Sequence, residues 1–322
     1  MNCNIKNRTI LCGDSLEISR GIDSNTIDLI YLDPPFNKKK EFIAKEGSLS
    51  EGASFSDIFK KEHVKEEWIT TISDRYPILH EYIQGIGNIG HISNKYYLYY
   101  IGIRVIEFHR VLKETGSLYL HCDPLMSHYL KLLLDCVFGE KNFRNEIVWC
   151  YSSPSNTKRF FPRKHDTIFF YSKSSKWTFN HEDIRVPYKT LIEGEGGGFL
   201  KGYTISSSTG KLPEDWWNEC HDSMTPVGRI PAQRTGYPTQ KPLSLLERII
   251  KVSSNEGDIV LDPFCGSGTT CIAAEKLRRQ WVGIDISKEA YTLLKDRLGK
   301  EISNERDLFD PCKYVTFKDF PT

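Results

Sequence analysis

The chain has 322 residues, with 39% hydrophobic and 26% charged residues, nine cysteines and a formal net charge of +1. This globular composition excludes a mainly disordered, collagen-like or disulfide-stapled protein, and the length suits one large domain or a core with a smaller module. The sequence has no membrane-length apolar run, no signal-peptide pattern, no CxxC pair and no metal-ligand spacing, so we expect a cytoplasmic protein with reduced thiols and no metal site.

The first half of the chain alternates between apolar runs and helical periodicity. Residues 27–32 form a nearly continuous apolar run, typical of a buried parallel strand, and two prolines stop it immediately afterwards. Residues 37–93 are polar, lysine-rich and glycine-interrupted, with little periodicity, so we expect a long functional or mobile insertion. Helical spacing then predicts helices at residues 96–112 and 126–138, and strands are expected at residues 117–121 and 146–151.

In the second half, the pattern breaks and then resumes. Residues 152–236 are rich in serine, lysine and aromatic residues and contain a glycine-rich stretch, which predicts a second module or a large insertion. Beyond it the sequence predicts helices at residues 242–252, 269–277 and 288–298, and strands at residues 258–261 and 281–284. The alternation of strands and helices predicts an α/β fold with a doubly wound, mostly parallel sheet, as in Rossmann-like proteins.

A glycine-rich turn, Asp262-Pro263-Phe264-Cys265-Gly266-Ser267-Gly268-Thr269-Thr270, lies between a predicted strand and a helix. Glycines at the carboxyl edge of a parallel sheet let the backbone approach a bound cofactor. Asp285 ends the next strand, where it can accept hydrogen bonds from the ribose of a nicotinamide dinucleotide or of S-adenosylmethionine. A dinucleotide fingerprint needs a third small residue where this chain has Cys271, which favours S-adenosylmethionine.

The second chemical signal is Asp33-Pro34-Pro35-Phe36, at the end of the strand predicted at residues 27–32. The Asp33 carboxylate and the Pro34 carbonyl can both accept hydrogen bonds from one exocyclic amino group. The Phe36 ring can stack on a planar base. The motif therefore indicates a site for the amino group of a nucleobase.

These motifs and their order resemble the amino-directed DNA methyltransferases that use S-adenosylmethionine, specifically the permuted β group. In that group the Asp-Pro-Pro-aromatic motif precedes the F-x-G-x-G cofactor motif, and a target-recognition region lies between them. The resemblance covers most of residues 8–175 and 235–298. Further segments that resemble the family are Gly13-Asp14, residues 110–117, residues 161–166 and Thr239-Gln240-Lys241-Pro242.

The resemblance implies a catalytic domain formed by residues 1–175 and 236–300, a target-recognition region at residues 176–235 and a C-terminal tail at residues 301–322. It implies that Asp33, Pro34, Pro35 and Phe36 are catalytic. Asp14 is expected to hold the adenine amino group of the cofactor, and Asp285 its ribose. The full expected set of cofactor-binding residues is Asp14, Thr239, Gln240, Lys241, Pro242, Asp262, Phe264, Gly266, Ser267, Gly268, Thr269 and Asp285.

The implied chemistry is methyl transfer to a base that has flipped out of the duplex, because its amino group is inaccessible within the helix. Two acceptors on that amino group would localise its nitrogen lone pair, and the reaction requires neither a metal nor a histidine base. We therefore expect His121 and His165 to be structural or to contact phosphate. Asp33 favours N6 of adenine, since the cytosine-N4 members more often have serine there; cytosine N4 remains the alternative.

Duplex DNA is the expected partner, together with a homodimeric state and a cognate restriction endonuclease. The near-zero net charge argues against a uniformly basic surface, so DNA contact should rest on local clusters. The residues expected to bind DNA are Lys38, Lys39, Lys158, Arg159, Arg163 and Lys164. Two other classes of function are a nicotinamide-dependent oxidoreductase, opposed by Cys271, and a non-catalytic DNA-binding protein, opposed by the intact catalytic and cofactor motifs.

Overall fold

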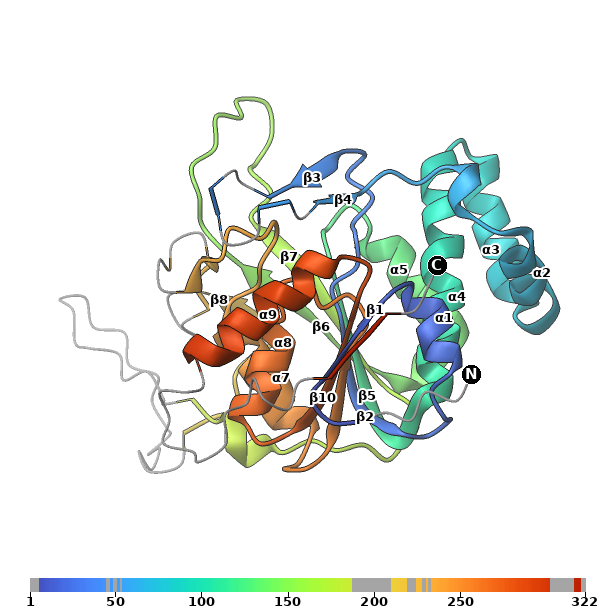
Figure 1. Cartoon of the computed structure of the whole chain (residues 1–322). Helices are drawn as coiled ribbons and strands as arrows, with labels where there is room; N and C mark the ends of the chain where they lie inside the picture. Colours follow the sequence, from blue (N-terminus) through green and yellow to red (C-terminus); the bar gives the residue numbers. More distant parts are fainter. Residues whose placement is uncertain are drawn as a thin grey trace, which may run out of the picture.

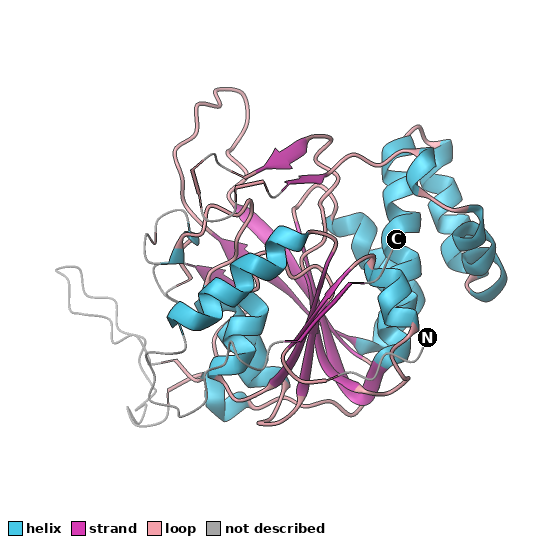
Figure 2. Ribbon diagram, in the orientation of Figure 1, coloured by secondary structure: helices cyan, strands magenta, loops and turns pink. Residues whose placement is uncertain are grey.

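The computed structural model describes residues 6–44, 47–48, 51–52, 54–186, 210–218, 224–227, 230, 233–301 and 316–319. Its centre is a sheet with strand order β11-β1-β10-β9-β2-β5-β7-β6-β8, covered by helices on both faces (Figures 1 and 2). These strands are β1 (Thr9–Cys12), β2 (Ile27–Leu32), β5 (Leu112–Cys122), β6 (Phe143–Cys150), β7 (His165–Ser172), β8 (Trp216–Asn218), β9 (Ile259–Asp262), β10 (Gln280–Asp285) and β11 (Thr316–Asp319).

The sheet is mostly parallel, as predicted. The strands from β11 to β5 in this order all pair in parallel, whereas β7 runs antiparallel between β5 and β6. Side chains of β2 alternate between the two faces: Ile30 and Leu32 pack into one core, and Leu29 and Tyr31 into the other. A strand buried on both faces is apolar along its whole length, which explains the nearly unbroken apolar run at residues 27–32.

Two groups of helices cover the sheet. On one face lie α1 (Ser15–Arg20), α4 (Ile92–Val111) and α5 (Ser127–Phe138), with α2 (Glu66–Arg75) and α3 (Pro77–Asn88) packed outside them. The other face carries α7 (Leu243–Ser253), α8 (Thr269–Lys276) and α9 (Lys288–Glu301). The helices predicted after residue 95 are confirmed, with ends that shift by a few residues.

The expectation for residues 37–93 is wrong in one respect, because much of this segment is regular and packed. It contains the antiparallel pair β3 (Glu41–Ile43) and β4 (Ser54–Ser56), the 3-10 turn Lys61–His63, and the helices α2 and α3. Each helix buries a narrow stripe, Trp68 and Ile72 in α2 and Leu79 and Ile83 in α3. Both helices are amphipathic, so the sequence carries a helical period here that the analysis overlooked within a polar, glycine-interrupted segment.

Four strands of the main sheet lie outside the sequence prediction. Both β1 and β7 are buried strands, although β7 lies in a segment that the sequence analysis interprets only as a basic cluster. β11 lies within the expected tail, residues 301–322, and pairs in parallel with β1. In the expected recognition region, residues 176–235, β8 joins the main sheet beside β6, and most of the remainder lies outside the described residues. Within the described part of the chain, no helix is long and apolar enough to cross a membrane.

Candidate active site

The carboxyl ends of four parallel strands meet at one edge of the sheet and enclose a cavity of about 540 Å³. Gly13 and Asp14 follow β1, the Asp33–Phe36 motif follows β2, the glycine turn follows β9, and Asp285 ends β10. The cavity wall thus brings together most of the residues predicted for catalysis and cofactor binding. The predicted residues that line it are Asp14, Asp33, Pro34, Pro35, Phe36, Lys38, Thr239, Gln240, Lys241, Asp262, Phe264, Ser267, Thr269 and Asp285.

The glycine turn is shaped by its backbone. Gly268 has a φ of 75° and directly precedes α8, and Gly266 has a φ of 47°, so both adopt the left-handed conformation that glycine favours. The Gly266 N–H donates to Asp285 Oδ2 at 2.8 Å, and the Cys265 N–H donates to the Ile284 carbonyl at 2.9 Å. The turn is therefore fixed to the end of β10. Gly266, Gly268 and Pro242 support the cavity without lining it.

Two carboxylates line the cavity, Asp262 buried and Asp285 half-buried. Asp262 accepts hydrogen bonds from the Phe264 N–H at 3.0 Å and from the Thr270 hydroxyl at 2.5 Å. Burial nevertheless raises the pKa of Asp262 to about 7, and burial also raises the pKa of Asp285. A cation in the cavity would favour the ionised form of both groups.

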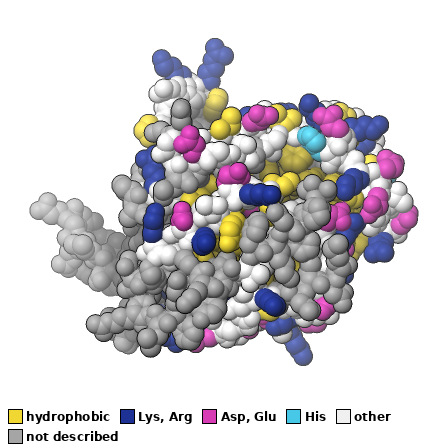
Figure 3. Space-filling model, viewed as in Figure 1, with side chains coloured by type: hydrophobic (Ala, Val, Ile, Leu, Met, Phe, Trp, Pro, Cys, Tyr) yellow, Lys and Arg dark blue, Asp and Glu magenta, His cyan; other side chains and the backbone are white. Residues whose placement is uncertain are grey.

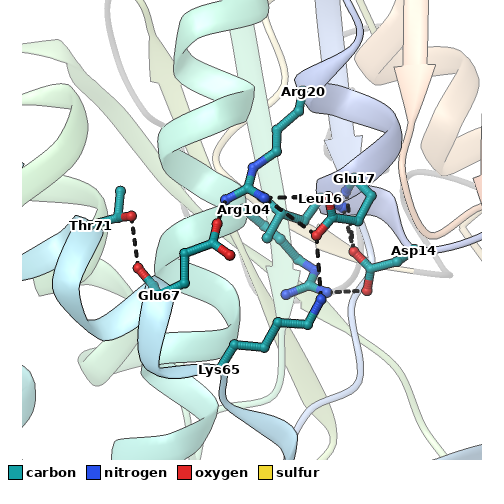
Figure 4. A network of polar contacts seen from close by, with 8 residues as sticks. All are labelled: Asp14, Leu16, Glu17, Arg20, Lys65, Glu67, Thr71 and Arg104. Carbon is teal, nitrogen blue, oxygen red and sulfur yellow. Dashed lines mark hydrogen bonds and ion pairs between the residues drawn. The ribbon is translucent and has the colours of Figure 1, made fainter. Parts of the chain in front are cut away.

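Asp14 lines the cavity, as predicted, and its carboxylate accepts hydrogen bonds from the Leu16 and Glu17 N–H groups and from Arg104 (Figure 4). Its Oδ1 caps α1 by accepting the Leu16 N–H at 2.8 Å, and its Oδ2 accepts Arg104 Nη2 at 2.5 Å. Arg104 is fully buried, and its guanidinium lies 3.6 Å from the centre of the Tyr100 ring. No local pattern in the sequence indicates this buried arginine, which fixes Asp14 to α4.

The same network joins the inserted helix α2 to the catalytic core (Figure 4). Glu17 of α1 pairs with Arg20 and with Lys65, which precedes α2, and Arg20 also pairs with Glu67 in α2 at 2.8 Å. Trp68, on the next position of α2, lines the cavity. The insertion at residues 37–93 therefore forms part of the cavity wall.

The catalytic motif contains an ion pair that the sequence did not predict. Lys241 Nζ donates to Asp33 Oδ2 at 2.5 Å and to the Thr239 carbonyl at 3.2 Å. The Lys241 side chain is only 7% exposed. The sequence analysis grouped Lys241 with the cofactor residues, whereas in the structure its ammonium group contacts the carboxylate of Asp33, which is predicted to be catalytic.

The Phe36 ring rests on a buried polar layer. It stacks on the His121 ring, with centroids 5.9 Å apart and an interplanar angle of 19°. His121 Nδ1 lies 2.8 Å from the Tyr31 hydroxyl, and Nε2 lies 3.2 Å from Asp166 Oδ2. Burial lowers the pKa of His121, so this ring is neutral at pH 7. His121 supports Phe36 from behind and does not line the cavity, in agreement with the expected structural role.

Asp57 holds the chain that follows the catalytic motif, and the sequence analysis missed it. Its side chain is 1% exposed and accepts the backbone N–H groups of Asn37 at 2.5 Å and of Lys38 at 3.0 Å. Asn37 and Lys39 have φ values of 59° and 58°, an unfavourable conformation for residues with a side chain. Because Asp57 lies where the sequence has little periodicity, no local pattern indicated its role.

The cations predicted to bind DNA fall into two groups. Lys38 and Lys39 are exposed beside the cavity, and Lys38 lines its rim. Lys158, Arg159, Arg163 and Lys164 lie on the loop at residues 151–164, which joins β6 to β7. Lys173, which follows β7, instead donates a hydrogen bond to the Leu112 carbonyl at 2.7 Å and so links β7 to the start of β5.

Comparison with known families and proteins agrees with this geometry. The model of the DNA methylase family, which covers N6 and N4 methyltransferases, matches residues 27–296. The chain is 30% identical to the Type II methyltransferase M.HpaI of Haemophilus parainfluenzae, over 91% of this chain and 75% of the relative. It is 29% identical to the DNA adenine methyltransferase YhdJ of Escherichia coli K12, over 88% of this chain and 79% of the relative.

Two solved structures share the fold. The PvuII DNA methyltransferase, described as cytosine-N4-specific, has a TM-score of 0.56 at 14% identity, and the match covers 98% of this chain and 96% of that chain. The DNA modification methylase TTHA0409 of Thermus thermophilus, solved with S-adenosyl-L-methionine, has a TM-score of 0.51 at 17% identity, and the match covers 98% of this chain and 100% of that chain.

Proposed function

We propose that this chain, which belongs to the DNA methylase family, transfers the methyl group of S-adenosylmethionine to the N6 amino group of adenine at a specific sequence in duplex DNA. The observation that carries the proposal is the meeting of the Asp33–Phe36 motif and the glycine turn at residues 264–269 around one cavity. A nicotinamide-dependent reaction is not favoured, because the matched family consists of methylases.

The chemistry of the cavity fits S-adenosylmethionine. When bound, this cofactor supplies an electrophilic methyl group on a sulfonium, and it carries net positive charge near its amino-acid end. A cavity of about 540 Å³ is in the range usual for small-ligand sites. Asp262 and Asp285 both line the cavity, where a cationic ligand would favour their ionised forms and offset the effect of burial on their pKa values. The proposed cofactor residues are Asp14, Thr239, Gln240, Asp262, Phe264, Gly266, Ser267, Gly268, Thr269 and Asp285.

The catalytic motif would act on the target amino group by placing two acceptors around it. Lys241 already occupies Asp33 Oδ2, so we assign Asp33 Oδ1 and the Pro34 carbonyl to the two amino hydrogens. Hydrogen bonds in these positions favour a pyramidal nitrogen with a localised lone pair that can attack the methyl carbon. The protein contributes orientation and fixed acceptors, and forms no covalent bond with the substrate.

The Phe36 ring would hold the flipped base by stacking. The ring is 7% exposed and is backed by His121, so its orientation is fixed before the base arrives. Lys38 and Lys39 lie beside it, where they can contact the DNA backbone. The cations at residues 158–164 provide a second phosphate-binding group on the same side of the sheet.

Adenine is the proposed target because the motif begins with Asp33, and the 29% identical relative YhdJ is named as an adenine methyltransferase. The cytosine-N4 enzymes share the fold and supply the second candidate. The test is to treat unmethylated DNA with purified protein and S-adenosylmethionine, and then to identify the modified nucleoside by mass spectrometry and its sequence context by sequencing. N6-methyladenine at one short sequence is expected. N4-methylcytosine, or no modified base, would overturn the assignment.

Sequence recognition is proposed to reside in residues 176–235, because the catalytic motif and the cofactor turn face groups that every target shares. Replacing this segment with that of a similar enzyme should transfer the recognised sequence without changing the methylated atom. An active chimera that keeps its original target sequence would move recognition to residues 37–93.

A homodimer, a cognate restriction endonuclease and a cytoplasmic location complete the proposal. The relatives named Type II methyltransferases support the endonuclease and are bacterial, and bacterial DNA lies in the cytoplasm. Sedimentation of the purified protein tests the dimer, and a single monomeric species would exclude it.

A further inference from the structure

The loop at residues 151–164 carries an aromatic ring that the chain leaves in solvent. Phe161 is 94% exposed, more than any other large hydrophobic side chain in the described part of the chain. Its neighbour Phe160 is 63% exposed and lies beside the Arg163 guanidinium, 5.5 Å from the ring centre. A single exposed apolar side chain is common on protein surfaces, so the ring points to a partner only together with the position, shape and charge of its loop.

The loop rises from the edge of the sheet that holds the cavity. The loop begins after Cys150 of β6 and ends before His165 of β7, and these two residues pair in the sheet. Two residues further along β7, Thr167 pairs with Cys122, which ends β5 at its carboxyl end. β5 in turn pairs with β2, the strand that leads into the catalytic motif. The loop accordingly projects above the sheet on the same side as β3 and β4 (Figure 1).

The tip is shaped to present the ring. Pro162 follows Phe161, and a residue before proline is restricted to extended conformations. The Thr157 hydroxyl donates to the Phe160 carbonyl at 3.1 Å, which closes the turn next to it. The Phe160 carbonyl thus contacts Thr157 and its ring contacts Arg163. The Phe161 ring makes no ring contact with any residue that the structure describes.

The charges of the loop identify the partner as a polyanion. Lys158 and Arg159 precede the two phenylalanines, Arg163 and Lys164 follow them, and residues 151–164 contain no acidic residue. Figure 3 shows cationic side chains projecting at the top of the molecule, where Figure 1 places this loop. Cations on both flanks of an apolar ring match a DNA strand, which has phosphates on both sides of each base.

We propose that the Phe161 ring enters the duplex at the position that the target nucleotide leaves when it turns into the cavity. This inference rests on the proposed function, which requires the base to flip. The departure of one base removes a stacking partner from each neighbouring base pair, and an inserted aromatic ring replaces that partner. The four cations hold the phosphates on either side while Phe36, inside the cavity, holds the base itself.

The test compares a normal duplex with one in which the target base is already unpaired. Both carry the recognised sequence established by sequencing of methylated DNA, and the second has an abasic site opposite the target adenine. Phe161→Ala should lower kcat/KM on the normal duplex by about tenfold, the loss expected for one stacking contact. On the second duplex the loss should shrink to within about twofold, because the target adenine there has no base pair to break and flips at lower cost without help from the ring. Phe161→Trp should restore activity on both.

Phe160→Ala is the matched control, since it removes an aromatic ring from the same loop, and it should change both rates by less than about twofold. An equal loss on both duplexes for Phe161→Ala, or no loss on either, would overturn the inference. The proposed function fails separately: wild-type protein would then methylate no base, or would methylate cytosine N4 in place of adenine N6. Active wild-type protein with an insensitive Phe161→Ala variant would contradict only the inserted ring.

Discussion

The glycine turn at residues 264–269 and the catalytic loop at residues 33–40 face one cavity but are held in place in different ways. The turn is fixed by its own N–H groups, which donate to the Ile284 carbonyl and the Asp285 carboxylate at the end of β10, about twenty residues further along the chain. The loop at residues 33–40 depends on side chains, of which Asp57 is equally near in sequence, whereas His121 and Lys241 come from much later segments. Substitutions that disturb catalysis can therefore lie far from the motif in sequence and leave cofactor binding intact.

We expect Asp33→Ala to separate methyl transfer from cofactor binding more completely than any other variant proposed here. This variant should lose methyl transfer altogether, because it removes an acceptor for the target amino group. Its affinity for S-adenosylmethionine, measured by calorimetry, should stay within about tenfold, or about 1.4 kcal/mol, of the wild type. The comparison variant is Gly266→Trp, whose side chain would collide with Tyr237, since even a Cβ there lies 2.8 Å from that ring. Equal loss of cofactor affinity in both variants would contradict the assigned role of Asp33.

Lys241→Met tests whether the distant ion pair belongs to the catalytic side of the cavity. We expect kcat to fall by about a hundredfold, since a carboxylate without its fixed partner no longer positions the amino group. The dissociation constant of S-adenosylmethionine should change by less than about threefold, and Lys241→Arg should recover part of kcat. Lys61→Met, at an exposed position, serves as control. A large loss of cofactor affinity in Lys241→Met would return Lys241 to the cofactor residues.

Asp57→Asn probes the support of the catalytic loop. An asparagine side chain directs an NH2 group at one of the two backbone N–H groups that Asp57 now accepts. Leaving a buried donor without an acceptor costs about 1–3 kcal/mol, so thermal unfolding should occur at a lower temperature. Below that temperature kcat should fall by about tenfold while cofactor affinity remains. Wild-type kcat in a folded variant would show that the loop does not depend on Asp57.

The affinity for S-adenosylmethionine should depend on pH through Asp262. Burial raises the pKa of Asp262 to about 7 in the free protein, and a cationic ligand prefers the ionised form. Affinity for S-adenosylmethionine should therefore rise with pH up to about 7, by at most tenfold per unit, and then level off. The same group makes the free protein less stable as pH rises from about 4 to about 7, because the folded state binds this proton more tightly than the unfolded state. Asp262→Asn should flatten the affinity profile, and an unchanged profile would assign it to another group.

The difference between the two regions also explains what the sequence could predict. β2 and β9 are each followed directly by the motif that they position. An apolar run and the turn next to it were therefore enough to predict both strands and both motifs from the sequence. The pairing of Lys241 with Asp33 spans 208 positions, and no local pattern records a contact of that kind. Arg104 lies fully buried among apolar residues of α4. The sequence does not show that Asp14, 90 positions earlier, supplies the carboxylate that pairs with it.

Elements were missed for related reasons. α2 and α3 are amphipathic and pack against α4, but the polar, glycine-interrupted residues around them concealed their period. β7 lies between β5 and β6, but its apolar residues follow a cluster of cations that dominated the interpretation of the segment. In each case tertiary packing supplied information that a short window of sequence lacks.

The position of β1 has a consequence for biosynthesis. β1 is completed by residue 12, yet its two neighbours in the sheet are β10, which ends at residue 285, and β11, at residues 316–319. At about 5–20 residues per second, a ribosome needs roughly 15–60 s to make the intervening chain. During that interval the first strand has both edges unpaired, and the cavity lacks the glycine turn and Asp285. The emerging polypeptide thus stays catalytically silent and dependent on protection from aggregation until β10 and β11 have left the ribosome.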